Sequence, residues 1–294
     1  MSSAITKIAY LGPRGTFSGL VAHKRFGSSL ERIPVPGIYE VFEYVRQRRD
    51  AIGIVPIENS SGGTIYETID CLVERRRPLV IREELALQVR LALLGHRGEK
   101  IQALYSHFAP MQHCDEWIRK HLPRVERKEV ASTALAAETV ATNRHAAALG
   151  MREAAKRYKL DILEFPVQPE VPNLTQFVCI GHRPDAKVKA DKTSLIITLH
   201  NRPGSLCELL EIFRDLRINM TRILSRPIIG QPKSYVFFVD VEGSPENSPL
   251  REALARARKT AESLRLAGAY PSRRPYLSRC ERETRARPSS ISNA

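Results

Sequence analysis

The stretch GIYEVFEYVRQRRDAIGIVPIE, residues 37–58, decides the architecture of the first part of the chain. Its first half has a helical pattern, and its second half, residues 50–58, is a short apolar run that ends in a polar loop. The earlier run KIAYLG, residues 7–12, also ends in a loop rich in glycine, proline and hydroxyl residues. This alternation of strand, loop, helix and strand predicts an α/β layered domain.

The same alternation continues toward the middle of the chain. Apolar residues alternate in LALQVRLALLG, residues 85–95, and the pattern resumes through ALYSH, residues 103–107, and an alanine-rich stretch at residues 132–158. The segment GHRPDAKVKADKT, residues 181–193, is polar, charged and without periodicity, so we expect a linker there. The first domain is therefore predicted to span residues 1–182.

A second pattern follows the linker. Two helical stretches alternate with four strand-like runs, TSLIITLHN (193–201), INMTRILSRPI (218–228), SYVFFVDVEG (234–243) and LRLAGAYP (264–271). This βαββαβ order over about 80 residues predicts a ferredoxin-like domain, residues 193–272. The first helix carries one apolar stripe, formed by Leu206, Leu209, Leu210, Phe213 and Leu216. Both helices can then cover one face of the sheet.

Charge is concentrated near the end of the sequence. Lysine and arginine number 46 against 32 aspartates and glutamates, which gives a net charge of +14 and raises the question of a nucleic-acid partner. Residues 273–294 alone hold six arginines and two glutamates, with little to build a core. We expect a basic, mobile tail there and no nucleic-acid partner.

Composition also bears on compartment. No apolar run approaches the ~18 residues of a membrane span, and the start MSSAITKIAYLG lacks the layout of a signal peptide. We therefore expect a cytoplasmic protein with no membrane partner. The cysteines form no CxxC pair, which favours reduced thiols over disulfides or a metal site; they are Cys71, Cys114, Cys179, Cys207 and Cys280.

Four polar loops are candidates for chemistry because strand ends present backbone N–H groups and small polar side chains to a cleft. They are GPRGTFS (12–18), VPIENSSGGTIYETID (55–70), YSHFAPMQHC (105–114) and PNLTQF (172–177). The first lacks the lysine of a phosphate-binding loop. None contains a Ser/His/Asp spacing, a zinc signature or a cofactor fingerprint, so no metal and no cofactor is expected.

Together these loops resemble the prephenate dehydratases that carry a C-terminal ACT regulatory domain. YLGPRGTFS is similar to the family's opening loop, VPIENSSGGTIYETIDCL to its PIENS motif, NLTQF to its N-x-TRF motif, and residues 200–227 to the ACT segment that ends in ESRP. The resemblance spans residues 7–272. It implies a catalytic domain of two α/β subdomains, like a periplasmic binding protein, with a cleft between them. It also implies a homodimer or homotetramer.

The resemblance further implies a reaction, the conversion of prephenate to phenylpyruvate, CO2 and water on the route to phenylalanine. Aromatisation drives this reaction, so the protein has to hold a dicarboxylate, orient it and help hydroxide to leave. The threonine of the TRF motif is the family's essential residue. Thr175 is therefore the candidate catalytic residue, which hydrogen-bonds or protonates the leaving hydroxyl.

Further residues carry over to the substrate site by resemblance. They are Thr16, Glu58, Asn59, Ser60, Ser106, His107, Asn173, Gln176 and Phe177. Gln176 stands where the family has arginine. If Thr175 faces the cleft, strand alternation places Gln176 on the opposite face, so Gln176→Arg is expected to be tolerated.

By the same resemblance, the ACT domain binds phenylalanine between adjacent subunits. The matching residues are Asn201, Pro203, Gly204, Ser205, Leu206, Ser225, Arg226 and Pro227. Gly204 is expected to let the ligand approach the backbone. Leu224 replaces the family's glutamate, so an ACT domain that only dimerises the protein is an alternative.

Three functions stay open from the sequence. The first is a prephenate dehydratase under feedback control by phenylalanine. The second is a diverged relative, either an arogenate dehydratase or a prephenate decarboxylase that does not aromatise its product. The third is a catalytically weak amino-acid sensor. Retention of Thr175 together with an intact PIENS loop favours the dehydratase.

Overall fold

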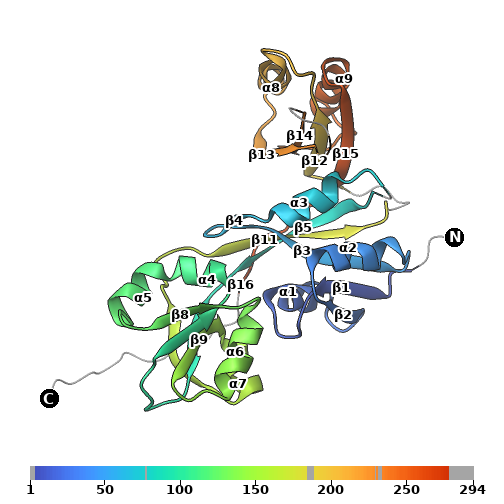
Figure 1. Cartoon of the computed structure of the whole chain (residues 1–294). Coiled ribbons are helices and arrows are strands. Elements are labelled where there is room, and N and C mark those ends of the chain that lie inside the picture. Colours follow the sequence, from blue (N-terminus) through green and yellow to red (C-terminus); the bar gives the residue numbers. More distant parts are fainter. Residues whose placement is uncertain (1–3, 77, 184–188, 229, 231–233, 278–294) are drawn as a thin grey trace.

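The computed structural model describes residues 4–76, 78–183, 189–228, 230 and 234–277, and its strands form three sheets (Figure 1). The first sheet belongs to subdomain 1. In spatial order its strands are β16 (Tyr276–Leu277), β5 (Val80–Gln88), β11 (Leu174–Gly181), β3 (Ala51–Asn59), β1 (Lys7–Leu11) and β2 (Glu31–Val35), and β4 (Gly63–Thr64) pairs with β3. The predicted strand–helix–strand alternation is confirmed, because β1 pairs in parallel with both β2 and β3.

The second sheet belongs to subdomain 2. Its strands, in spatial order, are β10 (Asp161–Val167), β6 (Leu91–Gly95), β9 (Ala146–Met151), β7 (Ala103–Ser106) and β8 (Glu126–Glu129). The chain passes between the subdomains twice, at residues 89–90 and 168–173. The two passages lie side by side, since the Val89 amide donates to the Asn173 carbonyl at 2.7 Å. The predicted pair of α/β subdomains is therefore confirmed.

Helices cover both faces of the first sheet. On one face, α1 (Phe17–Phe26) contributes Val21 and Ala22 to a core that also holds Phe177. On the other face lie α2 (Ile38–Arg46) and α3 (Tyr66–Val73). The helices of subdomain 2 are α4 (Phe108–His113), α5 (Asp115–His121), α6 (Thr133–Ala141) and α7 (Arg152–Tyr158).

The third sheet is the ACT domain, with strands in the order β13 (Met220–Pro227), β14 (Tyr235–Glu242), β12 (Lys192–Thr198) and β15 (Ser263–Tyr270). All neighbours in this sheet are antiparallel. Helices α8 (Ser205–Asp215) and α9 (Leu250–Thr260) pack together on one face, as the apolar stripes predict. The ferredoxin-like order is confirmed.

The second face of the ACT sheet packs on subdomain 1 (Figure 1). Phe238 and Tyr270 of the ACT sheet share one buried cluster with Ile57 and Val178 of β3 and β11. Gly268 allows this close approach, because a Cβ there would lie 2.3 Å from the Ile81 carbonyl oxygen of β5. Strands β3 and β11 therefore have the ACT domain behind them.

The predicted tail begins too early. Residues 273–277 belong to the folded chain, since β16 pairs with β5 and Tyr276 packs against the core around α1. Arg273 Nε also forms an ion pair with Glu83 at 2.5 Å. Composition could not reveal these partners, because Glu83 is far away in the sequence. The rest of the predicted tail, residues 278–294, lies outside the described residues.

Candidate active site

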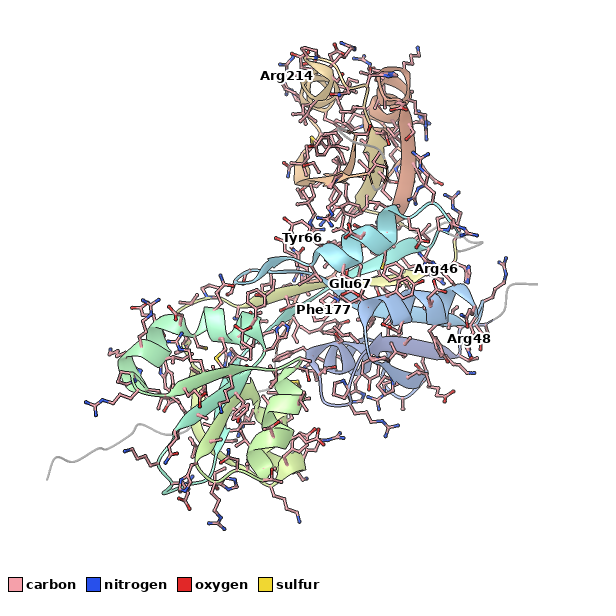
Figure 2. All side chains as sticks on the ribbon, in the orientation of Figure 1. Arg46, Arg48, Tyr66, Glu67, Phe177 and Arg214 are labelled. Carbon is pink, nitrogen blue, oxygen red and sulfur yellow. The ribbon has the colours of Figure 1, made fainter. Side chains whose placement is uncertain are left out.

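A cavity of about 330 Å³ lies where the two subdomains meet. Loops from both subdomains line it, together with the ends of β3 and β11. Figure 2 shows Phe177, one of its lining residues, in this central region. The residues of the predicted substrate site that the structure brings together here are Thr16, Asn59, His107, Asn173, Thr175 and Phe177.

Asn59 and Thr175 are direct partners on neighbouring strands. Asn59 Nδ2 donates to Thr175 Oγ1 at 2.8 Å and to Asn173 Oδ1 at 3.0 Å. Its Oδ1 accepts from the amides of Ser61 and Gly62, at 2.9 and 2.8 Å. Because both ends of the Asn59 amide are bound, its orientation is fixed.

This orientation decides the role of the Thr175 hydroxyl. An amide nitrogen can only donate, so Thr175 Oγ1 is the acceptor in its bond with Asn59. Among the described residues, no protein acceptor receives the hydroxyl hydrogen of Thr175. The hydroxyl hydrogen is therefore available to a molecule in the cavity.

Three helices begin at the cavity, and their N-cap residues line it. Thr16 caps α1 and accepts from the Gly19 amide at 3.4 Å, while Ser132 caps α6 and accepts from the Leu135 amide at 3.1 Å. His107 caps the short helix α4. Helix N-termini carry partial positive charge and unpaired N–H groups, which suit carboxylates. Of the described lining residues, none is lysine or arginine, so an anion in this cavity would depend on uncharged donors such as these N-termini.

His107 is held as a neutral ring. Its Nδ1 accepts from the Ala109 amide at 3.3 Å, which places the ring hydrogen on Nε2. Burial lowers the pKa of His107, and the charge of Glu129 acts weakly in the opposite direction. His107 can therefore offer a donor at Nε2 without carrying a charge.

Four predicted substrate residues lie outside the cavity lining. Glu58 and Gln176 point to the opposite side of the strands, where both contact Arg222. Ser60 binds backbone, accepting from the Leu174 amide at 2.9 Å. Ser106 is fully buried and donates to the Leu149 carbonyl at 2.8 Å. In the structure, these four side chains serve the framework.

Strand geometry explains which residues of β3 reach the cavity: alternation separates Glu58 from Asn59, and a bulge sets the face of Pro56. Thr175 pairs with Asn59 and Gln176 pairs with Glu58, but Phe177 pairs with Pro56, so β3 has one extra residue at Ile57. Such a bulge changes which side chains share a face. Pro56 and Asn59 line the cavity, whereas Ile57 lies in the core behind the sheet. The alternation argument for Gln176 holds.

Sequence reasoning missed the start of α6. Ala131, Ser132, Thr133 and Leu135 line the cavity and come from subdomain 2. The signal was present, because a serine and a threonine directly precede an alanine-rich helical stretch, which is typical of an N-cap. What the sequence could not show is that this helix starts opposite Thr175.

The ACT domain has a second cavity, of about 310 Å³, at the start of α8. Of the predicted regulatory residues, Asn201, Ser205 and Leu206 line it. Pro203 and Gly204 lie in the same turn but are not among its lining residues. Gly204 has a φ of 85° and a Cβ there would meet only Glu208, at 3.9 Å. The turn conformation itself thus requires glycine, whatever the space available to a ligand.

The remaining predicted regulatory residues, Ser225, Arg226 and Pro227, lie on β13 and do not line this cavity. Arg226 instead binds both carboxylate oxygens of Asp70, each at 2.6 Å, and lies over the Tyr66 ring. Figure 2 shows Tyr66 on the side of α3 that faces the ACT domain. Within one chain, Arg226 therefore joins the two domains.

No group of three or more potential metal ligands occurs among the described residues. In the same part of the chain, none of the helices has the length and apolar character needed to cross a bilayer.

Comparisons with known proteins divide the chain into the same two regions as the structure. A family model described as prephenate dehydratase matches residues 8–185, and one described as ACT domain matches residues 193–259. The bifunctional chorismate mutase/prephenate dehydratase of Pseudomonas aeruginosa is 35% identical over 268 residues, which are 90% of this chain and 73% of that protein. The prephenate dehydratase of Methanocaldococcus jannaschii is 34% identical over 273 residues, covering 90% of this chain and 97% of that protein.

Solved structures show the same relationship. The crystal structure of prephenate dehydratase from Arthrobacter aurescens in complex with L-Phe has a TM-score of 0.81 and 27% identity, and 90% of each chain is covered. The matches extend across the catalytic region and the ACT domain in order. The chain therefore belongs to the prephenate dehydratase family and carries an ACT domain after its catalytic region.

Proposed function

We propose that the protein converts prephenate to phenylpyruvate, CO2 and water. The observation that carries this proposal is the Thr175 hydroxyl, which accepts from Asn59 and keeps its hydrogen for a molecule in the cavity. Membership of the family supplies the substrate class. The reaction makes the protein a lyase of phenylalanine biosynthesis.

In the proposed reaction, the bond between the ring and its carboxylate breaks and CO2 leaves. The electron pair of that bond completes the aromatic ring as the C–O bond at the opposite carbon breaks. The departing hydroxide takes a proton, supplied in the net reaction by the solvent, and leaves as water. Thr175 donates a hydrogen bond to this oxygen as charge develops. A neutral alcohol is a weak acid, so placement of the donor matters more than its acidity.

The substrate carries two carboxylates, and the cavity offers uncharged donors to them. The N-termini of α1 and α6, capped by Thr16 and Ser132, face it from opposite subdomains. Backbone N–H groups bind carboxylates without placing a counter-charge beside the reacting ring. Binding across the two subdomains also positions the ring at Thr175.

Product analysis tests the proposal. The purified protein is incubated with prephenate, and the products are identified by absorbance and mass. Phenylpyruvate with one equivalent of CO2 is the expected result. A decarboxylated product that is not aromatic would identify a prephenate decarboxylase, and faster turnover of arogenate to phenylalanine would identify an arogenate dehydratase. No turnover of either compound would favour an amino-acid sensor.

Regulation by phenylalanine is part of the proposal. The ACT cavity presents the start of α8 to a carboxylate, and the related Arthrobacter aurescens protein was solved with L-Phe. The effector has to favour one arrangement of the ACT domains, because a ligand shifts an equilibrium only by its differential affinity. Calorimetry tests this, with phenylalanine binding and inhibition expected. If phenylalanine, tyrosine and tryptophan all fail to bind at millimolar concentration, the domain would have the role of a dimerisation domain only.

Assembly and location complete the proposal. We expect a homodimer or homotetramer in the cytoplasm, in which residues of β13 such as Ser225 and Pro227 approach the effector cavity of an adjacent subunit. Analytical ultracentrifugation tests the assembly. A monomer that is still inhibited by phenylalanine would contradict an effector site between subunits.

A further inference from the structure

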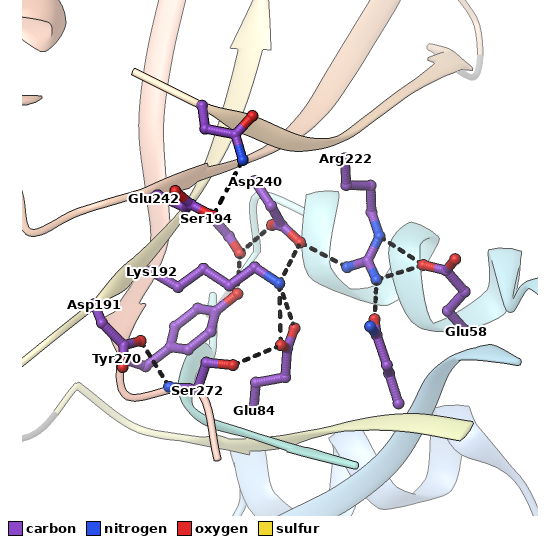
Figure 3. Close-up of polar contacts among 12 residues, drawn as sticks. Glu58, Glu84, Asp191, Lys192, Ser194, Arg222, Asp240, Glu242, Tyr270 and Ser272 are labelled. Carbon is purple, nitrogen blue, oxygen red and sulfur yellow. Dashed lines mark hydrogen bonds and ion pairs between the residues drawn. The ribbon is translucent and has the colours of Figure 1, made fainter. Parts of the chain in front are cut away.

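A cluster of charges lies behind the catalytic strands, between them and the ACT domain (Figure 3). At its centre is Arg222 of β13, whose side chain is only 7% exposed. Its Nη2 donates to Glu58 Oε2 and to Gln176 Oε1, both at 2.6 Å, and its Nη1 donates to Asp240 Oδ2, also at 2.6 Å. Arg222, Glu58, Gln176 and Asp240 are called the Arg222 cluster below.

The cluster is placed directly behind the reacting residues. Gln176 pairs with Glu58 across β11 and β3, and the next pair along the same two strands is Thr175 with Asn59. Since successive side chains of a strand point to opposite faces, one pair faces Arg222 and the other faces the cavity. A single guanidinium therefore joins β3 to β11 one residue away from the bond between Asn59 and Thr175.

The positive charge of this cluster comes from the ACT domain. Gln176 is neutral, so β11 supplies no cation to Glu58, and the cation that pairs with Glu58 is carried by β13. Arg222 is itself held from behind by Asp240, which is fully buried. Asp240 in turn accepts from Ser194 Oγ at 2.5 Å, and Lys192 lies 3.9 Å from it while binding Glu84 of β5 at 2.8 Å. The position of the guanidinium is thus fixed by the ACT sheet.

We infer that Arg222 is a positioning residue for the dehydratase reaction: from the ACT domain, it holds the spacing of β3 and β11 and thereby the alignment of Asn59 with Thr175. The inference rests on the proposed function. A shift of about 1 Å in a reacting group can cost about 10²-fold in rate, so a small change in strand spacing is enough to matter. Any rearrangement of the ACT sheet that moves β13 would act on Thr175 through this contact.

A second contact between the domains provides a matched control. Arg226, four residues further along β13, binds Asp70 of α3 through two bonds of 2.6 Å. Helix α3 packs on the same face of the sheet, but Asp70 is not among the residues that line the cavity. Asp70→Asn therefore weakens an ion pair between the same two domains without touching β3 or β11.

The test compares Arg222→Gln, Arg222→Lys and Asp70→Asn in the full chain, with kcat and KM measured for prephenate. We expect Arg222→Gln to lower kcat by tenfold or more while KM changes less than threefold, because binding groups on α1 and α6 are untouched. Arg222→Lys keeps the charge but lacks the planar guanidinium and its several N–H donors, so its kcat should lie between those of Arg222→Gln and the wild type. Asp70→Asn should stay within twofold of the wild type. An unchanged kcat in Arg222→Gln, or an equal loss in Asp70→Asn, would overturn the inference.

Two further measurements keep the inference testable. If Arg222→Gln does not fold because Asp240 is left without its partner, Glu58→Ala removes the link to β3 and leaves Asp240 paired; a loss of kcat is again expected, and full activity would overturn the inference. If the wild type does not turn over prephenate, the proposed function fails on its own. Hydrogen exchange then decides: exchange should rise at residues 58–60 and 174–177 in Arg222→Gln and not in Asp70→Asn, and equal exchange would overturn the inference.

Discussion

Asn59 Nδ2 lies 2.8 Å from Thr175 Oγ1, and its Oδ1 is bound by the amides of Ser61 and Gly62. The turn after β3 therefore fixes the asparagine, and the asparagine directs the threonine hydrogen into the cavity. In the proposed reaction this hydroxyl donates to the leaving oxygen. Its effect depends on the direction of one hydrogen bond, which mutation can reverse.

Asn59→Asp reverses that direction. The introduced carboxylate keeps an oxygen for the Ser61 and Gly62 amides, but its second oxygen accepts where Asn59 Nδ2 donated. The Thr175 hydroxyl then donates to this carboxylate and not to the substrate, and the new charge repels a dianion. We expect kcat/KM for prephenate to fall by about 10²-fold or more, in the range that a positioned proton donor contributes.

A matched control for this variant is Asn143→Asp. Asn143 also accepts from a backbone amide of its own turn, that of His145 at 3.2 Å, and it is not among the cavity residues. Its kcat/KM should remain within twofold of the wild type. Equal activity of Asn59→Asp and wild type would show that the Thr175 hydroxyl does not have to donate.

The contacts of Gln176 change the expectation for Gln176→Arg, which strand alternation alone predicted to be tolerated. Gln176 Oε1 lies 2.6 Å from Arg222 Nη2, so an arginine at position 176 places two guanidinium groups against each other with Glu58 between them. We expect lower thermal stability and a lower kcat. Combining it with Arg222→Gln removes the repulsion and should recover part of both losses relative to Gln176→Arg alone.

A full set of kinetic and melting data for these variants forms a double-mutant cycle. Losses that simply add would show that residues 176 and 222 act independently. In that case the contact between the β11 strand and the ACT domain has no energetic role.

Acid should destabilise the protein through His107. Burial lowers the pKa of His107 below its ordinary value of 6.5, so the folded state binds fewer protons than the unfolded state just below that pH. The stabilising contribution is complete above about pH 6.5 and is lost as pH falls through the lowered pKa. His107→Asn keeps an N-cap acceptor for the Ala109 amide but does not titrate.

Melting temperature measured between pH 8 and pH 5 tests this. The wild type should lose more stability than His107→Asn as pH falls below about 6.5. His113, whose pKa burial also lowers, is present in both proteins and cancels in the comparison. Parallel curves for the two proteins would mean that His107 does not couple folding to pH.

Much of the fold could be predicted from periodicity. The helix at residues 38–46 and the strand at residues 51–59 follow from apolar spacing within a single segment. The ACT order followed in the same way from one βαββαβ pattern. The pairing of Tyr276 with β5 could not be predicted, because two residues of strand carry no periodic signal and the partner is about 190 positions away.

The site was predictable only in part. Neighbouring motif residues such as Glu58 and Asn59 were expected together, but the pleat of the strand places them on opposite faces, and a bulge at Ile57 brings Pro56 to the face of Asn59. Sequence carries alternation but not the position of a bulge. Arg222 could not be found at all, because nothing near it in the chain indicates that β13 packs behind Thr175.

The kcat of Thr175→Ala on prephenate, measured together with that of Thr175→Ser, is the decisive test of the role proposed for Thr175. The alanine removes the one hydroxyl that Asn59 directs into the cavity. We expect kcat to fall by orders of magnitude while the fold and phenylalanine binding persist, and serine to recover part of the rate. A loss of less than about tenfold in a folded Thr175→Ala, equivalent to only ~1.4 kcal/mol of barrier, would contradict the central role given to this hydroxyl.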